Sequence, residues 1–310
     1  MDRIDLHCDT PLRLYQSRGS LISNNLHIDL ERAAPFSRFL QCAALFCPAG
    51  IPDADGFSFV LSMAEYFKAE IRAAGNAVTV DTKKELEAAW KAGKRAFLLT
   101  VEDARILDGK IERIPLLRAL GVRIVTPLWR GVSAIGGAHD TDVGLSPFGA
   151  KAMEEMATLR ILPDVSHACE KSFRGIREIT KAKGLPLVAT HSCAAALCPH
   201  TRNLSDAQIR EIAESGGVVG LNFYPPFLCK NGRADIGDLL AHLRHLFRVG
   251  GRDLPALGAD FDGVDALPVG IGGIEDIERL CSEMKHCGFS EDDADRFSFQ
   301  NAARVLRSVL

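Results

Sequence analysis

Short apolar runs alternate with amphipathic stretches along the whole chain. We expect eight of these runs, rich in Val, Ile, Leu and Phe, to be β-strands. They span residues 3–9, 39–47, 95–103, 121–129, 161–167, 185–192, 216–224 and 254–263. Most of them lack the strict apolar–polar alternation of a strand with one wet face, which is typical of parallel strands covered on both faces. The pattern therefore predicts a parallel sheet buried among helices.

Helical periodicity appears between these runs. Clear examples are 57–75, 82–93, 149–160, 205–216 and 236–251, and Ser205 and Gln208 have the spacing of a capping box. Strands that alternate with helices eight times predict an α/β fold, a (β/α)8 TIM barrel with its active site at the C-terminal ends of the strands. A doubly wound open sheet gives the same alternation and is the alternative. The absence of a Gly-rich phosphate loop after the first run argues against its nucleotide-binding form.

Length and composition narrow the class of protein. We expect a single barrel domain over 1–310, because no linker, repeat or low-complexity segment divides the chain. A net charge of −3 argues against a nucleic-acid partner. With no apolar run of transmembrane length and no signal-peptide pattern, we expect no membrane association. Nine cysteines, odd in number and without a CxxC pair, predict free thiols in the cytoplasm.

Candidate metal ligands stand at the ends of four predicted strands: His7, Asp9, Glu102, His167 and His191. In a barrel, the C-terminal ends of the strands meet at one mouth, so residues distant in sequence share one pocket. Imidazole nitrogens and carboxylate oxygens suit Zn²⁺ or a similar divalent ion. The sequence thus predicts a metal site. His242 and His245, three positions apart, are expected instead on an exposed helix.

The stretch "DLHCDT" at 5–10 places a thiol between two of these ligands. Side chains at i and i+2 of a strand point the same way, so His7 and Asp9 face one ion and Cys8 faces the covering helices. A Cys8 nucleophile is the competing hypothesis, and the two orientations exclude each other. After the last run, Asp260 and Asp262 share a face only if the strand continues, and we expect it to end near Asp260.

Several motifs occur in an order that is similar to a known family. They are "HCD" at 7–9, "VED" at 101–103, "GLSPFG" at 144–149, "DVSH" at 164–167, "THS" at 190–192, "PHTRNLSD" at 199–206, "NFY" at 222–224 and "GADFDG" at 258–263. From residue 5 to about residue 263 the chain resembles the membrane (renal) dipeptidase family of zinc metallopeptidases, in the amidohydrolase superfamily. The resemblance implies a barrel with two divalent metal ions, expected to be Zn²⁺. Such enzymes hydrolyse small dipeptides by a metal-activated hydroxide and tolerate a D-residue at the C-terminal position.

The resemblance also implies roles for the candidate ligands. His7 and Asp9 would hold one ion, His167 and His191 the second, and Glu102 would bridge both. Family members are often dimers, so a homodimer is a further expectation.

Four further residues acquire implied roles in binding and chemistry. Asp260 would be the general acid and base, since a carboxylate beside the ions can pass a proton to the leaving amine. Arg202 would bind the substrate's C-terminal carboxylate, which its planar fork suits. Asn222 and Tyr224 would line the substrate pocket.

One position departs from the family pattern. The family often has "TLTH" where this chain has "IVTPLWRG" at 124–131. Trp129 therefore stands at or near the position where the family has a His that helps to polarise the substrate carbonyl. Loss of such a donor costs roughly 10²–10³ in rate. His139 in "IGGAHD" is a candidate replacement. Trp129 also leaves open another amide or ester hydrolase, such as a deacetylase or lactonase. A non-catalytic metal-binding barrel is a third hypothesis, against which the complete ligand set argues.

Overall fold

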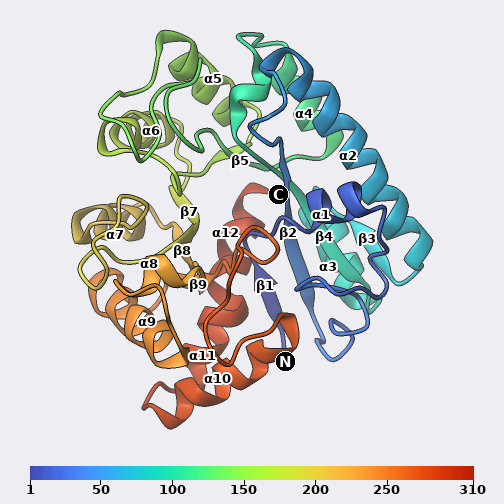
Figure 1. Cartoon of the computed structure of the whole chain (residues 1–310), viewed down its shortest axis with the longest axis vertical. Helices are drawn as coiled ribbons and strands as arrows, with labels where there is room; N and C mark the ends of the chain where they lie inside the picture. The colour runs from blue at the N-terminus through green and yellow to red at the C-terminus, as the bar shows by residue number, and fades with distance from the viewer.

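Eight parallel strands form a barrel in the computed structural model, which describes residues 1–310 (Figure 1). They are β1 (Arg3–Asp5), β2 (Phe39–Phe46), β4 (Arg95–Glu102), β5 (Ile124–Thr126), β6 (Leu162–Pro163), β7 (Val188–Ser192), β8 (Val218–Leu221) and β9 (Pro255–Leu257). Their order around the barrel is β6-β5-β4-β2-β1-β9-β8-β7. A single parallel bridge between Asp164 and Val188 joins the two ends of this order. The predicted TIM barrel is therefore confirmed.

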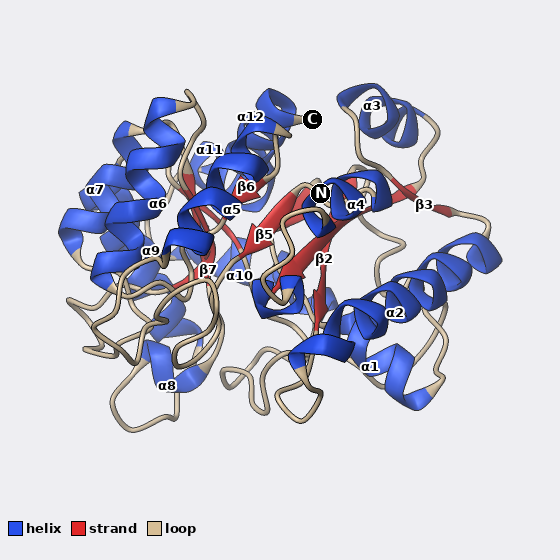
Figure 2. Ribbon diagram, turned by 90° about the horizontal axis from the view of Figure 1, so that it is seen from above, coloured by secondary structure: helices blue, strands red, loops and turns tan.

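Helices surround the strands, as Figure 2 shows. They are α1 (Thr10–Ser17), α2 (Asp53–Ala74), α3 (Lys83–Lys91), α4 (Arg113–Leu120), α5 (Pro147–Thr158), α6 (Glu170–Ala182), α7 (Asp206–Glu214), α8 (Pro225–Leu228), α9 (Ile236–Gly250), α10 (Ile277–His286), α11 (Glu291–Asp295) and α12 (Asn301–Val309). The predicted capping box begins α7, where Ser205 and Gln208 bond each other's main-chain N–H groups. No helix has both the length and the apolar character needed to cross a bilayer.

The barrel has one additional strand beside it, and a helix covers one of its ends. A short strand, β3 (Ala77–Thr79), pairs with β4 outside the barrel, and its three residues gave no clear signal in the sequence. At the N-terminal ends of β8 and β9, Asn301 donates to the carbonyl of Pro255 and Arg304 to that of Gly217. Helix α12 thus covers one end of the barrel, crossing the middle of the ring of strands in Figure 1. The opposite end remains for a site.

All nine cysteines are free, and two histidines of α9 are buried. The cytoplasmic location inferred from those cysteines stays a prediction. The expected exposed position of His242 and His245 on α9 is wrong, because they are only 1% and 4% exposed. His242 accepts the N–H of Ala194 and donates to the carbonyl of Leu228, so it joins main-chain segments. His242 therefore has a structural role in the core.

Candidate active site

The segment after β1 carries the first two candidate ligands. Strand β1 ends at Asp5, whose carboxylate accepts the N–H of His7 at 3.1 Å. After a bend, the chain pairs with the segment after β9 through a bridge from Cys8 to Phe261. His7 then points to the barrel centre near Asp9, while Cys8 is fully buried in the apolar core. His7 and Asp9 thus lie together and Cys8 faces away from them, as predicted, although the strand ends earlier than expected.

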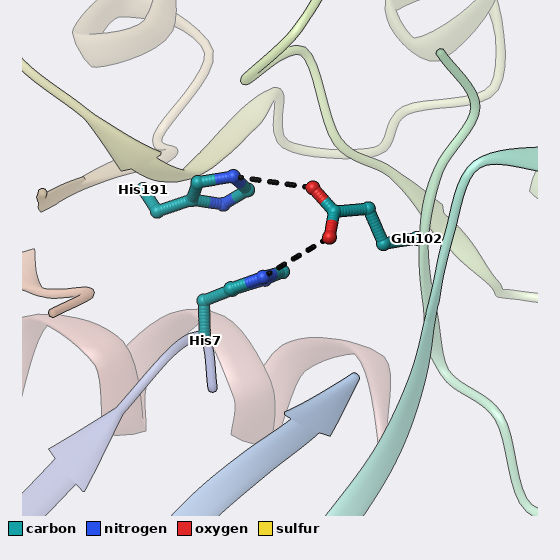
Figure 3. A group of neighbouring side chains, drawn as sticks. All are labelled: His7, Glu102 and His191. Carbon is teal, nitrogen blue, oxygen red and sulfur yellow. Dashed lines mark ion pairs between the residues drawn. The ribbon is translucent and has the colours of Figure 1, made fainter. Parts of the chain in front are cut away.

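Glu102 faces the rings of His7 and His191 with different carboxylate oxygens (Figure 3). From the end of β4, its Oε1 lies 2.9 Å from Nε2 of His167 and 3.5 Å from Nε2 of His191. Its Oε2 lies 3.6 Å from Nε2 of His7, which is 3.5 Å from Oδ2 of Asp9. All five side chains are buried. The barrel therefore brings together the five candidate ligands that stand far apart in the sequence.

The ring nitrogens of this cluster have the chemistry of a cation site. Nδ1 of His167 lies 2.9 Å from the carbonyl of Trp129, which only accepts, so Nδ1 carries the proton and Nε2 a lone pair. That Nε2 is 3.0 Å from Nε2 of His191. Nε2 of His7 and Oδ1 of Asp9 are buried without a hydrogen-bond partner. Buried, unpartnered nitrogen and oxygen donors fit a divalent ion.

Burial and the neighbouring charges keep most members of this cluster in the protonation state that binds a metal ion, ionised for Glu102 and neutral for His167 and His191. Although burial opposes its charge, His7 and the two other histidines lower the pKa of Glu102 well below its usual range. Burial lowers the pKa of His167 to about 4 and that of His191 well below its usual value. Burial also opposes the charge of His7, but Glu102 and Asp9 raise the pKa of that ring well above its usual value. His7 therefore holds a proton that a cation would replace.

Asp260 stands beside this cluster on the turn that follows β9. Its backbone has φ of +62°, a strained conformation for a residue with a side chain. Oδ2 accepts from the amide of Asn222 at 2.9 Å, and Oδ1 is 3.8 Å from Nε2 of His7. Burial, reinforced by the charge of Asp9, raises the pKa of Asp260 to about 7. A Cβ at Gly263 would overlap the carboxylates of Asp9 and Asp260, so the turn requires glycine there.

A cavity of about 430 Å³ opens over these residues. Seven predicted site residues line it: Asp9, Glu102, Trp129, His167, Arg202, Tyr224 and Asp260. Arg202 is 4% exposed; it donates from Nη2 to the carbonyl of His191 at 3.4 Å, and its Nη1 has no partner. Asn222 does not reach the cavity, since it is fully buried against Asp260.

The β5 loop places Trp129 and His139 differently. Trp129 lines the cavity, with its ring 4.9 Å from that of Phe46. His139 lies beside His167, whose carbonyl accepts its N–H at 2.7 Å, and its Nδ1 lies 2.8 Å from the hydroxyl of Thr201. The side chain of His139 does not line the cavity. The replacement suggested for the missing family His therefore borders the site without facing its cavity.

Similarity to known proteins identifies the family. The family model described as membrane dipeptidase, peptidase family M19, matches residues 1–310. The chain belongs to this family. It is a metallo-dipeptidase, an enzyme class that uses divalent metal.

Relatives of this dipeptidase include proteins without a described activity. An uncharacterised Klebsiella pneumoniae protein from the pqqA 5′ region is 36% identical over 226 residues, which is 69% of this chain and 82% of that protein. An uncharacterised dipeptidase of Schizosaccharomyces pombe is 32% identical over 244 residues, 74% of this chain. The match spans 57% of the length of that yeast relative.

Two solved structures share the whole fold of this dipeptidase. A dipeptidase AC of family M19 is 29% identical, with a TM-score of 0.92 over 100% of this chain and 98% of that one. A Rhodobacter sphaeroides metallopeptidase bound to a phosphinate mimic of the dipeptide L-Ala-D-Ala is 27% identical. Its TM-score is 0.93 over 100% of this chain and 99% of the other.

Some residues around the site of this dipeptidase were not assigned from the sequence. Asp164, in the "DVSH" motif, accepts hydrogen bonds from Thr126 of β5, Thr190 of β7 and Ser166 in its own segment. An Asp inside an apolar run was the available signal. Phe46 forms part of the cavity wall, and nothing distinguishes it in the sequence from a core phenylalanine.

Proposed function

We propose that this enzyme hydrolyses small dipeptides, including those with a C-terminal D-residue, at a centre of two Zn²⁺ ions. The carrying observation is the buried group of His7, Asp9, Glu102, His167 and His191, in which Nε2 of His7 and Oδ1 of Asp9 have no hydrogen-bond partner. Three of its members, Asp9, Glu102 and His167, line the cavity that Asp260 and Arg202 also line. The dipeptide mimic bound to the Rhodobacter sphaeroides relative supports the substrate class, since it carries a D-Ala.

In this proposal Glu102 would contribute to both ions, because its two oxygens face different histidines. His7 and Asp9 would hold one ion, and His167 and His191 would hold the other. When bound, such ions supply Lewis acidity that polarises a scissile carbonyl and makes water a stronger acid.

Asp260 acts as the proton carrier. Its carboxylate borders both the cavity and His7, and its pKa of about 7 in the metal-free protein suits both uptake and release of a proton. It takes the proton of the attacking water and delivers it to the amine that leaves. The amide of Asn222 holds the carboxylate in place for both transfers.

Arg202 binds the C-terminal carboxylate of the substrate. Its buried Nη1 has no partner within the protein, so a carboxylate in the cavity satisfies both its charge and its donor. The loop of Arg202 follows β7 and Trp129 follows β5, and β6 separates these two strands in the barrel. The dipeptide thus extends from Arg202 toward Trp129 and Phe46, which contact its N-terminal residue, while Tyr224 lies on the side of Arg202.

Turnover by metal-replete protein tests this proposal. We expect hydrolysis across a panel of L,L and L,D dipeptides, loss of activity with a chelator and recovery with Zn²⁺. A metal-replete protein that is inert toward the entire panel contradicts the proposal.

Trp129 favours a second candidate function at the same centre, hydrolysis of another amide or ester. An aromatic wall in place of a cationic donor gives a pocket suited to an acyl group. Competition between N-acyl amino acids and dipeptides separates the two functions: higher kcat/KM for the acyl compounds supports a deacylase, and the reverse supports a dipeptidase.

A further inference from the structure

A buried carboxylate links β5, the segment after β6 and β7 beside the proposed metal ligands. Asp164 is 1% exposed, and its Oδ2 accepts the hydroxyls of Thr126 at 2.6 Å and Thr190 at 2.5 Å. Its Oδ1 accepts the main-chain N–H groups of Ser166 at 3.0 Å and Thr190 at 2.9 Å. The donors come from the last residue of β5, the segment after β6 and the middle of β7. Asp164 thus fixes the hydroxyl of Thr190 in one orientation.

The same hydroxyl contacts a proposed metal ligand. Oγ1 of Thr190 lies 2.8 Å from Nδ1 of His191. A threonine hydroxyl has one hydrogen, and Asp164 accepts it, so the oxygen faces His191 with a lone pair. Nδ1 of His191 must then be the protonated nitrogen that donates to it. The lone pair of the ring is left on Nε2, which lies 3.5 Å from Oε1 of Glu102.

We infer that Thr190, oriented by Asp164, is a positioning residue that selects the metal-ligating tautomer of His191. This inference rests on the proposed metal centre. A neutral imidazole has two tautomers, and only the one protonated on Nδ1 offers Nε2 to an ion. The carbonyl of Trp129 does the same for His167, so both nitrogens on the Oε1 side of Glu102 are set before metal arrives.

Three variants separate tautomer selection from packing. Thr190→Val keeps the shape of the side chain and removes the hydroxyl, whereas Thr190→Ser keeps the hydroxyl. Thr126→Val removes the other hydroxyl from the same oxygen of Asp164 and touches no histidine ring. Zn²⁺ affinity is measured by competition with a chromophoric chelator, and bound metal by mass spectrometry. We expect Thr190→Val to bind one of its ions roughly 10–100-fold more weakly, and the other two variants to match wild type.

Ring-nitrogen NMR of the metal-free protein reads the tautomer directly, with His191 assigned from its absence in His191→Gln. We expect the Nδ1–H form in wild type and Thr190→Ser, and an increased Nε2–H form in Thr190→Val. Three results overturn the inference: an Nε2–H ring in wild type, no change in Thr190→Val, or equal loss of affinity in Thr126→Val. A wild-type protein that binds no divalent ion would instead refute the proposed metal centre, and the NMR spectrum would still decide the role of Thr190.

Discussion

The imidazole rings of His7 and His191 stack with their centroids 3.8 Å apart and their planes 28° from parallel. They come from the segment after β1 and from β7, and β9 and β8 separate these two strands in the barrel. Nε2 of each ring also lies within 3.6 Å of an oxygen of Glu102. The two proposed ion sites therefore share both a carboxylate and a ring contact, and the loss of one member is expected to disturb both.

Asp260→Asn tests the proton carrier. We expect kcat to fall by roughly 10²–10⁴, because the amide cannot take and return a proton, while KM and bound metal stay close to wild type. Steady-state kinetics and metal content check this result, with Asp142→Asn, an 87% exposed carboxylate, as the control. Wild-type kcat in Asp260→Asn would remove this residue from the mechanism.

Arg202→Met tests recognition of the C-terminal carboxylate. The variant keeps an unbranched side chain and loses the buried charge, so we expect kcat/KM for dipeptides to fall roughly 10–100-fold. For dipeptide amides, which lack the carboxylate, the fall in kcat/KM should be far smaller. Equal losses for the acid and the amide would mean that Arg202 supports the fold of the site and not its substrate.

Metal affinity should rise with pH. His7, whose pKa is raised by Glu102 and Asp9, and Asp9, whose pKa burial raises to about 6, must give up protons to bind an ion. His167 and His191 release none near neutrality, since burial already keeps them neutral. Calorimetry in buffers of different ionisation enthalpy should therefore detect proton release at pH 7, and chelator competition should find weaker binding at pH 6. An affinity independent of pH would contradict these assignments.

Cys8→Ser should retain nearly wild-type turnover. Burial raises the pKa of the Cys8 thiol well above its usual range, and the side chain lies in the apolar core, away from the cavity. A buried hydroxyl should lower the free energy of unfolding by about 1–3 kcal/mol, measurable by denaturant titration. A folded, metal-loaded Cys8→Ser protein without activity would revive the thiol nucleophile.

The barrel was predictable because each parallel strand, covered on both faces, leaves an apolar run in the sequence. The runs nevertheless overestimate the strands. The run at 161–167 contributes only the strand Leu162–Pro163 and the single bridge of Asp164 to the sheet, and His167 lies beyond them. The rest of that run is site loop, apolar because it is buried, and periodicity does not separate buried loop from buried strand.

The candidate ligands were predictable because barrel topology brings strand ends together and few polar residues occupy those ends. The supporting contacts were not. In the sequence, Thr190 cannot be distinguished from an ordinary β-branched residue of a strand. Only the fold places its hydroxyl between Asp164 and His191. Phe46 and Phe227 likewise become cavity walls only through tertiary packing.

The metal content of wild type and Glu102→Ala, measured by mass spectrometry after purification with Zn²⁺, tests the central claim most directly. The matched control is Glu65→Ala, an exposed glutamate on α2. We expect two ions per chain in wild type and in the control, and loss of both in Glu102→Ala, because its two oxygens face both groups of ligands. A Glu102→Ala protein that keeps two ions, or a wild-type protein that binds none, would contradict the account.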